Sequence, residues 1–498
     1  MLNNHTINDK NSSNSSNNKN RGYLIMSYKS TTNNIYVNRL FLSLNHLLHA
    51  LHVFIMVLLP FSLVSFCFPK PQGTSTSSEK WVGTWSTALQ LVETGNNPPS
   101  PGLSNNTLRQ IVHVSIGGDS LRIRFSNEFS TSTVTLNSVH IAVAEGNGTI
   151  DTTTDKALFF NGKSDVTMAP GTAVTSDPFH FALQPLTDVA ITINFGRTSP
   201  DVTGHPGSRT TSYLLTGNKV SNANFSGAVT ADHWYVINKI DVLAPDSAYA
   251  VVILGNSITD GRGSGTNKQD RWPDELARRF QTNSGTRQVG VLNEGIGGNC
   301  VLGACLGPSA ISRFGNDVLN QNGVKWVVIF EGINDIGYSS NSTQIAQNLI
   351  SAFMQMIDSA HARGLRVYGA TLLPFGGSSY DSHDHQKAWQ TLNDWIRNSG
   401  RFDAVIDLDS AMQDPANPVK LLPVYDSGDH LHPSESGHHM MAEAVDLTLF
   451  GVADTTTDLI DEKYDNQRDT FLLGQNYPNL FNPTTVIKYN SPKAAMLH

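Results

Sequence analysis

Ser257 is the residue of this sequence whose surroundings best suit nucleophilic chemistry. It follows an apolar run at residues 250–254 that predicts a buried strand. Gly255 and Gly261 flank it and permit a tight strand-to-helix turn, which presents the hydroxyl at the edge of a sheet. A serine hydroxyl is a weak nucleophile until a base takes its proton. Because a serine that only caps a helix looks the same, the assignment depends on a base elsewhere in the chain.

The segment Asp-His-Leu-His-Pro, which begins at Asp429, supplies a candidate base. Asp429 and His432 are three residues apart, a spacing that lets both side chains share one side of a turn. The carboxylate then holds the imidazole while the second ring nitrogen faces a serine, as in a Ser-His-Asp triad. A solvated loop with a chance acidic residue is the plain alternative.

A metal site is a competing interpretation of the same region, because several histidines cluster there. Catalytic zinc takes three protein ligands and keeps one position open. The dedicated motif His-Glu-x-x-His does not occur in the sequence, so a metal-dependent hydrolase is kept as an alternative. The histidines concerned are His430, His432, His438 and His439, with His383 and His385 further back.

Two further segments offer hydrogen-bond donors after predicted strands. The glycine-rich stretch 293–299 can leave a backbone N–H free to face a ligand, and Asn334 offers a side-chain amide. Donors of this kind stabilise the negative charge that builds on the carbonyl oxygen during ester hydrolysis. The glycines do not form a dinucleotide-binding fingerprint, because Cys300 stands where Gly-x-Gly-x-x-Gly requires its last glycine.

Ser, Gly, Asn and Asp-x-x-His follow one another after successive predicted strands, and this ordered set resembles the SGNH/GDSL hydrolase superfamily. The resemblance covers about residues 248–450. It implies that Ser257 is the nucleophile, that His432 is the general base and then the general acid, and that Asp429 orients His432.

The resemblance also implies an oxyanion hole. Its donors are the Ser257 N–H, the Gly298 N–H and the side chain of Asn334. Gly298 is preferred to Gly297, because family members place this glycine just before a polar residue, here Asn299.

One position departs from the family pattern, since Asn256 stands where an Asp usually precedes the nucleophile. Asparagine keeps the hydrogen-bonding shape and loses a charge. The family uses this position mainly to support the loop, so we expect reduced rather than abolished activity.

The literal string Gly-Asp-Ser-Leu occurs elsewhere, around Ser120. It lies between two β-like stretches, no helical pattern follows it, and no Asp-x-x-His is near. We therefore expect a turn here and keep Ser257 as the nucleophile.

The catalytic region, residues 245–452, has the pattern of an α/β fold. Apolar strands that alternate with helices indicate a parallel sheet covered on both faces, a three-layer α/β/α arrangement that the resemblance makes flavodoxin-like. Sites in such sheets form at the carboxyl ends of the strands. The predicted strands are 250–254, 289–292, 326–330, 367–373 and 404–406, and the predicted helices are 274–281, 343–362 and 386–397.

Residues 80–240 have a different pattern, with strict alternation at 121–125 and 189–195 and frequent turn signals. Many short strands predict an all-β sandwich or jelly roll. It resembles the accessory domain fused to some of these hydrolases.

Both ends of the chain carry export signals. Residues 1–73 form a polar extension and a hydrophobic run at 53–68, which predicts a cleaved signal peptide, with a retained membrane anchor as the alternative. Translation from Met26 is a further option. Residues 453–498 predict a linker and a segment, 471–489, that resembles the opening of the C-terminal sorting domain of bacterial type IX secretion. We expect a secreted or cell-surface protein.

Composition excludes some partners. The net charge of −8 gives no electrostatic basis for nucleic-acid binding. The mechanism needs no cofactor, and the sequence leaves the oligomeric state open. Cys300 and Cys305 are predicted either as a small disulfide loop or as two thiols.

The favoured function is hydrolysis of carboxylic esters, with short acyl or acetyl groups, including those on polysaccharides, as substrates. The rival hypothesis is a non-catalytic carbohydrate-binding or adhesion protein on a hydrolase scaffold.

Overall fold

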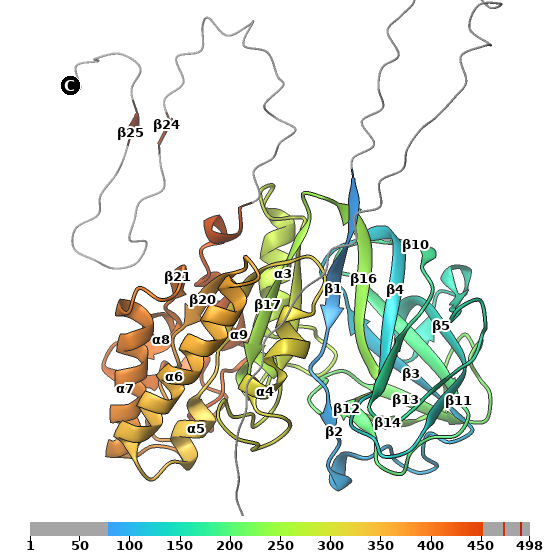
Figure 1. Ribbon diagram of the computed structural model, residues 1–498, viewed down its shortest axis with the longest axis horizontal. Coiled ribbons are helices and arrows are strands. Elements are labelled where there is room, and N and C mark those ends of the chain that lie inside the picture. Colours follow the sequence, from blue (N-terminus) through green and yellow to red (C-terminus); the bar gives the residue numbers. More distant parts are fainter. Residues whose placement is uncertain (1–77, 452–471, 474–488, 491–498) are drawn as a thin grey trace, which may run out of the picture. The chain divides into compact units, whose positions relative to one another are not determined.

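The computed structural model describes residues 78–451, 472–473 and 489–490. Its N-terminal part is β-rich and its C-terminal part is α/β (Figure 1). The hydrophobic run at 53–68 and most of the sorting-like segment lie outside the described residues. The described ends of that segment form two short antiparallel strands, β24 (Leu472–Leu473) and β25 (Tyr489–Asn490).

The β-rich part consists of antiparallel sheets. The first has the order β1-β16-β4-β10, with β9 beside β4, and the second has the order β14-β13-β3-β11-β5-β6, with β7 and β8 beside β5. A third, small sheet has the order β15-β12-β2. The strands of the first sheet are β1 (Glu79–Ser86), β4 (Gly118–Asn127), β9 (Thr172–Thr175), β10 (Phe179–Leu183) and β16 (Ile237–Pro245). Those of the second are β3 (Asn106–His113), β5 (Val134–Gly146), β6 (Thr149–Ile150), β7 (Lys156–Ala157), β8 (Val166–Met168), β11 (Asp188–Phe195), β13 (Ser212–Thr216) and β14 (Val229–Ala231). Those of the third are β2 (Gln90–Leu91), β12 (Thr203–His205) and β15 (Trp234–Tyr235), and two 3-10 turns, η2 (Thr94–Asn96) and η3 (Thr152–Thr154), complete this part.

Ser120 does not lie in a turn, and that prediction was wrong. It belongs to strand β4 and pairs with His180 of β10. The alternating residues that follow it extend the strand backwards through the glycine, because the neighbouring strand offers ladder partners that the local sequence cannot reveal.

The α/β part is built on a parallel sheet of order β18-β17-β19-β20-β21. Each of these strands overlaps one of the five apolar runs in the sequence. β20 ends at Ala370, earlier than predicted, because Leu372 N instead bonds Asn393 Oδ1 at 2.8 Å. The strands are β17 (Tyr249–Gly255), β18 (Val289–Gly295), β19 (Val324–Phe330), β20 (Arg366–Ala370) and β21 (Ala404–Ile406), and a hairpin pairs β22 (Gln413–Asp414) with β23 (Asn417–Leu421).

Helices connect the parallel strands, and α5, α6 and α7 lie next to one another (Figure 1). Side-chain caps fix where the longer ones begin: Asn341 accepts from Gln344 N, and Ser382 accepts from His385 N. The helices are α2 (Ser257–Asp260), α3 (Trp272–Thr282), α4 (Ala310–Phe314), α5 (Ile333–Tyr338), α6 (Ser342–His361), α7 (His383–Asn398), α8 (Leu408–Met412) and α9 (Glu435–Glu443), with a π-helical turn η4 (Gly315–Leu319) and 3-10 turns η5 (Pro423–Tyr425) and η6 (Leu447–Phe450).

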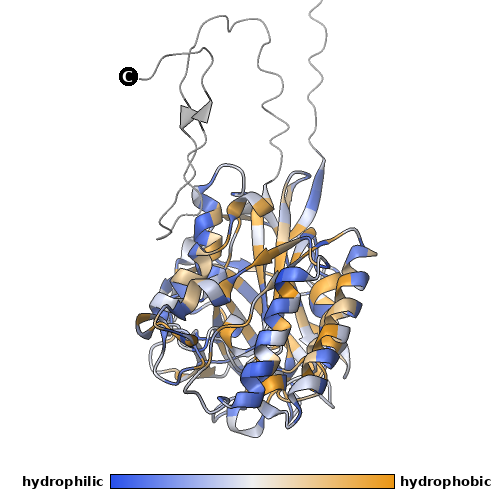
Figure 2. Ribbon diagram, turned by 90° about the vertical axis from the view of Figure 1, so that its left-hand side faces the viewer, coloured by the Kyte–Doolittle hydropathy of each residue, from blue (hydrophilic) through white to orange (hydrophobic). Residues whose placement is uncertain are grey.

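Hydrophobic residues concentrate in the strands, whereas the helices present polar and apolar faces (Figure 2). Most buried apolar side chains of both parts belong to one continuous cluster, and a small second cluster lies in the β-rich part. Strand β1 contributes to this continuity, because Thr87 at its end bridges to Asn293 of β18 and Ser86 Oγ donates to Glu294. The β-rich part is therefore packed onto the parallel sheet beside its edge strand. Within the described residues, the helices are too short or too polar to cross a membrane.

A buried hydrogen-bonded pair, His205 and Asp260, joins the two parts next to the turn that carries the candidate nucleophile. His205 of β12 bonds the carbonyl of Ala88 through Nδ1 at 2.8 Å and Asp260 Oδ1 through Nε2 at 2.8 Å. The side chains of His205 and Asp260 are 4% and 1% exposed, so water does not compete for this hydrogen bond.

We expect His205→Ala to lower the free energy of unfolding by about 2 kcal/mol or more, because it removes the hydrogen bond to the buried Asp260 Oδ1. Urea denaturation measures the loss. His361→Ala is the matched control, since His361 and Asp403 form a pair with side chains 40% and 37% exposed, and such pairs contribute about 0–1 kcal/mol. Equal losses in the two variants would contradict a larger contribution of the buried pair to the free energy of unfolding.

Candidate active site

Ser257 lies where strand β17 turns into helix α2. Gly255 ends the strand, and a Cβ there would lie 2.1 Å from Thr259 Oγ1, so the turn closes only over a glycine. Asn256 caps the helix, because its Oδ1 accepts from Ile258 N at 3.1 Å. The turn leaves Ser257 partly exposed while its neighbours on both sides are buried.

The structure brings Ser257, His432 and Asp429 into one hydrogen-bonded chain. Ser257 Oγ lies 2.8 Å from His432 Nε2, and His432 Nδ1 lies 2.7 Å from Asp429 Oδ2. The second carboxylate oxygen, Asp429 Oδ1, accepts from the N–H groups of Leu431 and His432 at 3.1 Å and 2.9 Å. The carboxylate is therefore held by its own turn, and it fixes the imidazole tautomer that leaves Nε2 as an acceptor toward the serine.

The electrostatics of this chain suit a base that is neutral at rest. Burial lowers the pKa of His432; the bond to Asp429 raises it, and the charges of Arg262 and Arg209 lower it further, so the net shift is downward. Partial burial raises the pKa of Asp429, but the hydrogen bonds from His432 and Leu431 outweigh it and lower the pKa to about 2. Asp429 is thus ionised wherever His432 titrates.

Gly298 and Asn334 are the other two candidate donors. Gly298 has a φ of 70°, which favours glycine, and its N–H has no hydrogen-bond acceptor among the described residues. Asn334 is buried in the first turn of α5, and its Nδ2 donates to Asn299 O at 2.7 Å. Tyr380 donates its hydroxyl to Asn334 Oδ1 at 3.0 Å, so it sets which end of the amide faces the site.

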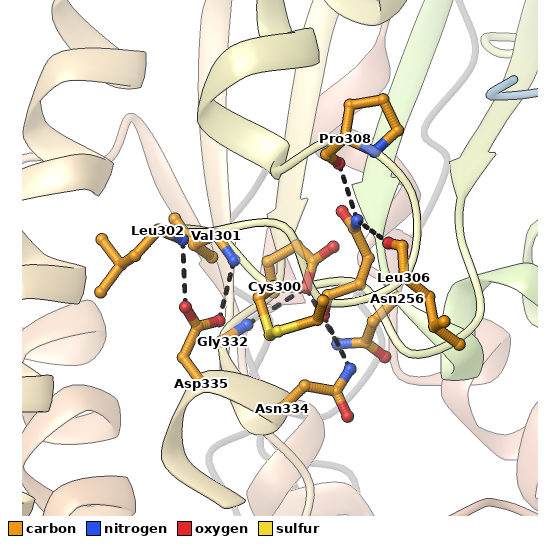
Figure 3. Close-up of a disulfide and its surroundings, with 12 residues drawn as sticks. Asn256, Cys300, Val301, Leu302, Leu306, Pro308, Gly332, Asn334 and Asp335 are labelled. Carbon is orange, nitrogen blue, oxygen red and sulfur yellow. Dashed lines mark hydrogen bonds between the residues drawn. A yellow bond between two sulfur atoms is a disulfide. The ribbon is translucent and has the colours of Figure 1, made fainter. Parts of the chain in front are cut away.

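A disulfide between Cys300 and Cys305 closes the loop that follows Gly298, with a Cα–Cα distance of 5.6 Å. The sequence had left this bond open. Asp335 holds the same loop from helix α5, because its carboxylate accepts from Val301 N at 2.8 Å and Leu302 N at 3.0 Å (Figure 3). The loop and α5 are therefore locked to each other beside the candidate oxyanion donors.

Arg313 is a buried residue of the site that the sequence analysis missed. Its guanidinium donates to Gly255 O at 3.0 Å, to Glu294 O at 2.8 Å and to Asn299 Oδ1 at 3.1 Å. It also lies 3.6 Å from Glu331 Oε1. One side chain thus links the ends of strands β17, β18 and β19. No local pattern around Arg313 signals this role.

Glu331 explains the asparagine that departs from the family pattern. Asn256 Nδ2 donates to Glu331 Oε2 at 3.1 Å, which an aspartate could not do. Burial raises the pKa of Glu331 to about 8, against the opposing charge of Arg313. Glu331 could have been identified from the sequence, because it is a charged residue directly after a predicted buried strand. Asn256 therefore avoids placing a second carboxylate against a buried one.

The histidines of the metal hypothesis have separate partners. His430 Nδ1 pairs with Asp426 at 2.5 Å, and His439 Nδ1 with Glu275 at 3.2 Å. His438 is buried between Trp272 N and Arg262 O, and burial lowers its pKa to about 4. His385 faces two backbone carbonyls. Within the described residues the structure gathers no group of three or more metal-ligating side chains.

Residues 253–440 match the model of the GDSL-like Lipase/Acylhydrolase family. This segment contains Ser257, Gly298, Asn334, Asp429 and His432, and strands β17 to β21 lie largely within it. The chain therefore carries a GDSL-like lipase/acylhydrolase domain preceded by a β-rich region. It is a carboxylic ester hydrolase.

Solved structures of esterases and lipases are also similar to part of the chain. One is an acetylxylan esterase from Geobacillus stearothermophilus, 20% identical, covering 41% of this chain and 94% of that one with a TM-score of 0.32. Another is a GDSL-like lipase from Bacteroides thetaiotaomicron, 24% identical, covering 39% of this chain and 84% of that one with a TM-score of 0.29. A search of curated proteins found no match.

We expect Glu331→Gln to become more stable relative to the wild type as the pH rises. The folded-state pKa of Glu331, about 8, lies above the ordinary value of 4.5, so its stabilising contribution is complete below that ordinary value and is lost as the pH rises through the folded value. Glutamine keeps the acceptor for Asn256 and cannot ionise. Urea denaturation from pH 5 to 9 measures the difference between the proteins. A difference that stays constant over this range would contradict the buried, proton-binding carboxylate.

Proposed function

We propose that this protein hydrolyses carboxylic esters through a covalent acyl-serine intermediate on Ser257. The observation that carries the proposal is the hydrogen bond of 2.8 Å between Ser257 Oγ and His432 Nε2. It pairs a serine at a strand-to-helix turn with an imidazole whose other nitrogen is held by Asp429. This is the arrangement that activates a serine for acyl transfer.

The first half of the reaction forms the acyl-enzyme. His432 Nε2 takes the Ser257 proton as Oγ attacks the ester carbonyl carbon, and the carbonyl π electrons move to oxygen. When the tetrahedral intermediate collapses, the C–O bond to the alcohol breaks and His432 returns the proton to the leaving oxygen. Asp429 stays ionised and stabilises the imidazolium.

The second half releases the acid. Water attacks the acyl carbon while His432 takes one of its protons, and collapse of the second intermediate breaks the bond to Ser257 Oγ, which regains that proton. The Ser257 and Gly298 N–H groups and the Asn334 amide donate to the oxyanion in both halves. Donors placed in advance need no reorganisation when the charge develops.

The surface beside these donors supports a saccharide ester as substrate. Leu306 lies against Gly298 and is 47% exposed. Tyr338, which is 67% exposed, packs edge-on against Tyr380 with 5.5 Å between ring centroids. Apolar and aromatic faces next to a polar centre suit a sugar ring that carries a short acyl or acetyl ester. Small-molecule esters and acylated polysaccharides are the proposed substrate classes.

Three further assignments belong to this proposal. The parallel sheet and its helices form a flavodoxin-like three-layer α/β/α domain within residues 245–452, and the strand order β18-β17-β19-β20-β21 supports it. The antiparallel sheets within 80–240 form a sandwich or jelly-roll domain. The hydrophobic run at 53–68 and the sorting-like segment support export to the cell surface or medium.

We expect Ser257→Ala to lower kcat on 4-nitrophenyl acetate by at least about a thousandfold, because no other group replaces the nucleophile. In the wild type, mass spectrometry detects an acyl-enzyme in which Ser257 carries an acetyl group. Ser120→Ala is the matched control and retains full activity. Loss of activity in Ser120→Ala, or its retention in Ser257→Ala, would exclude the assignment.

Tyr380 acts as a positioning residue for Asn334. We expect Asn334→Ala to lower kcat by on the order of 10²–10³. Tyr380→Phe, which removes only the hydroxyl bonded to Asn334 Oδ1, has a smaller effect on kcat and little on KM. Because the hydroxyl works through Asn334, Tyr380→Phe has no further effect in the Asn334→Ala background. Additive losses in the double variant would show that Tyr380 acts by another route.

A further inference from the structure

The helix that begins at Ser257, α2, has only four residues. Its backbone bonds run from Asp260 N to Asn256 O at 2.8 Å and from Gly261 N to Ser257 O at 3.0 Å. A single helical turn is only marginally stable by itself, so contacts from elsewhere must hold it. Because the turn carries both the Ser257 hydroxyl and the Ser257 N–H, a tilt of the turn moves two groups of the proposed mechanism together.

The α/β part holds the middle of this turn. Asn293 Nδ2 donates to Thr259 O at 2.8 Å. A Cβ on Gly295 would lie 2.3 Å from Asp260 N, so strand β18 lies directly against the backbone of the turn. The side chain of Asp260, which ends the turn, is instead enclosed by residues of the β-rich part.

Segment 205–209 of the β-rich part contacts both oxygens of the Asp260 carboxyl group. His205 Nε2 lies 2.8 Å from Oδ1. A Cβ on Gly207 would lie 1.9 Å from Oδ2, so the backbone of the segment passes against the second oxygen. Arg209 NH2 lies 3.5 Å from the same oxygen. The end of the serine turn is therefore held from outside the α/β part.

The ring of His205 is itself held by its surroundings. It stacks on Trp234 with 5.7 Å between ring centroids, and its Nδ1 donates to Ala88 O at 2.8 Å. Its strand, β12, pairs with both β2 and β15. A ring with fixed neighbours at its face and at both nitrogens can fix the position of Asp260 in turn.

We propose that His205 is a positioning residue for the reaction. By holding Asp260, it sets the orientation of the turn, and with it the position of Ser257 Oγ, which lies 2.8 Å from His432 Nε2. A misplacement of about 1 Å can slow an enzymatic reaction on the order of a hundredfold, so a contact outside the catalytic residues can contribute to kcat. This inference rests on the proposed function, since it gives the β-rich part a role in the same reaction.

General stabilisation of the fold is the competing explanation, and two variants of His205 separate it from positioning. The amide of glutamine reaches the place of Nε2, and that of asparagine reaches the place of Nδ1. His205→Gln therefore keeps the bond to Asp260 and loses the bond to Ala88 O, whereas His205→Asn does the reverse. An amide donates and accepts, so glutamine can bond Asp260 whichever partner holds the proton. Each variant loses one buried hydrogen bond, so both lower the free energy of unfolding to a similar extent.

The first experiment measures kcat and KM on 4-nitrophenyl acetate, and the rate at which diisopropyl fluorophosphate labels Ser257, whose Oγ displaces fluoride from phosphorus. We expect His205→Asn to lower kcat and the labelling rate by about tenfold or more, with little change in KM, and His205→Gln to lower them by less than about threefold. Equal values of kcat in the two variants, or a change in KM alone, would overturn the inference.

Gly207→Ala tests the same contact and removes no side-chain hydrogen bond. Its methyl group must displace either the Asp260 carboxyl group or the segment that holds it, so we expect kcat to fall by about tenfold. Gly95→Ala is the matched control, because Gly95 also lies in the β-rich part and a Cβ there meets no heavy atom within 4 Å. Equal values of kcat in these two variants would also overturn the inference, and the pair tests it even if the variants of His205 do not fold.

Hydrogen exchange separates this inference from the proposed function, because it needs no substrate. The N–H groups of Gly261 and Arg262 bond Ser257 O, and their exchange reports how often the turn opens. We expect faster exchange in His205→Asn than in His205→Gln, even if the chain hydrolyses no ester. Equal exchange in the two variants would overturn the positioning role. Activity retained by Ser257→Ala would overturn the proposed function alone.

Discussion

The buried guanidinium of Arg313 is the constraint on which the rest of the site depends. Parallel strands place their carboxyl ends at one edge, but they do not fix the loops that follow. Arg313 does so by donating to the carbonyls of Gly255 and Glu294 and to the side chain of Asn299, while it faces Glu331. One rigid, planar group thereby fixes the relative positions of the loops that carry the serine, the glycine and the asparagine. A buried charge with so many acceptors destabilises the folded protein little, whereas its removal destabilises the protein strongly because the acceptors lose their partner.

Arg313 also affects the protonation of Glu331, the carboxyl group that bonds Asn256. Arg313 favours the charged form of Glu331, whereas burial disfavours it more strongly, so the carboxylate binds a proton readily near neutral pH. Asn256 bonds to that carboxylate with its amide and to the helix α2 with its carbonyl oxygen. A neutral residue that both donates and accepts fits between a helix N-terminus and a buried acid better than a second acid would. The departure from the family pattern is thus matched by its surroundings.

The sequence predicts those parts of the candidate site whose signals are local. Apolar runs fix the strands, the glycines permit the turns, and Asp-x-x-His positions its own carboxylate. The residues that were missed act over long sequence separations: Arg313 binds three strand ends, Tyr380 orients Asn334, and His205 bonds Asp260 from the β-rich part. Ser120 failed for the same reason, since its strand forms through pairing with His180. Contacts of this kind follow from tertiary packing, which periodicity and motif spacing do not encode.

The β-rich part supports the turn that carries Ser257 and shares a core with the parallel sheet. Its apolar side chains join those of the parallel sheet in one core, so separating the two parts would expose surface that each buries on the other. His205 bonds Asp260 in the helix that begins at Ser257, and Arg209 lies beside the same carboxyl group. The contact between His205 and Asp260 therefore links the β-rich part to the turn that carries Ser257. A hydrolase segment alone would keep Ser257, His432 and Asp429 but lose the residue that bonds the buried Asp260 beside them.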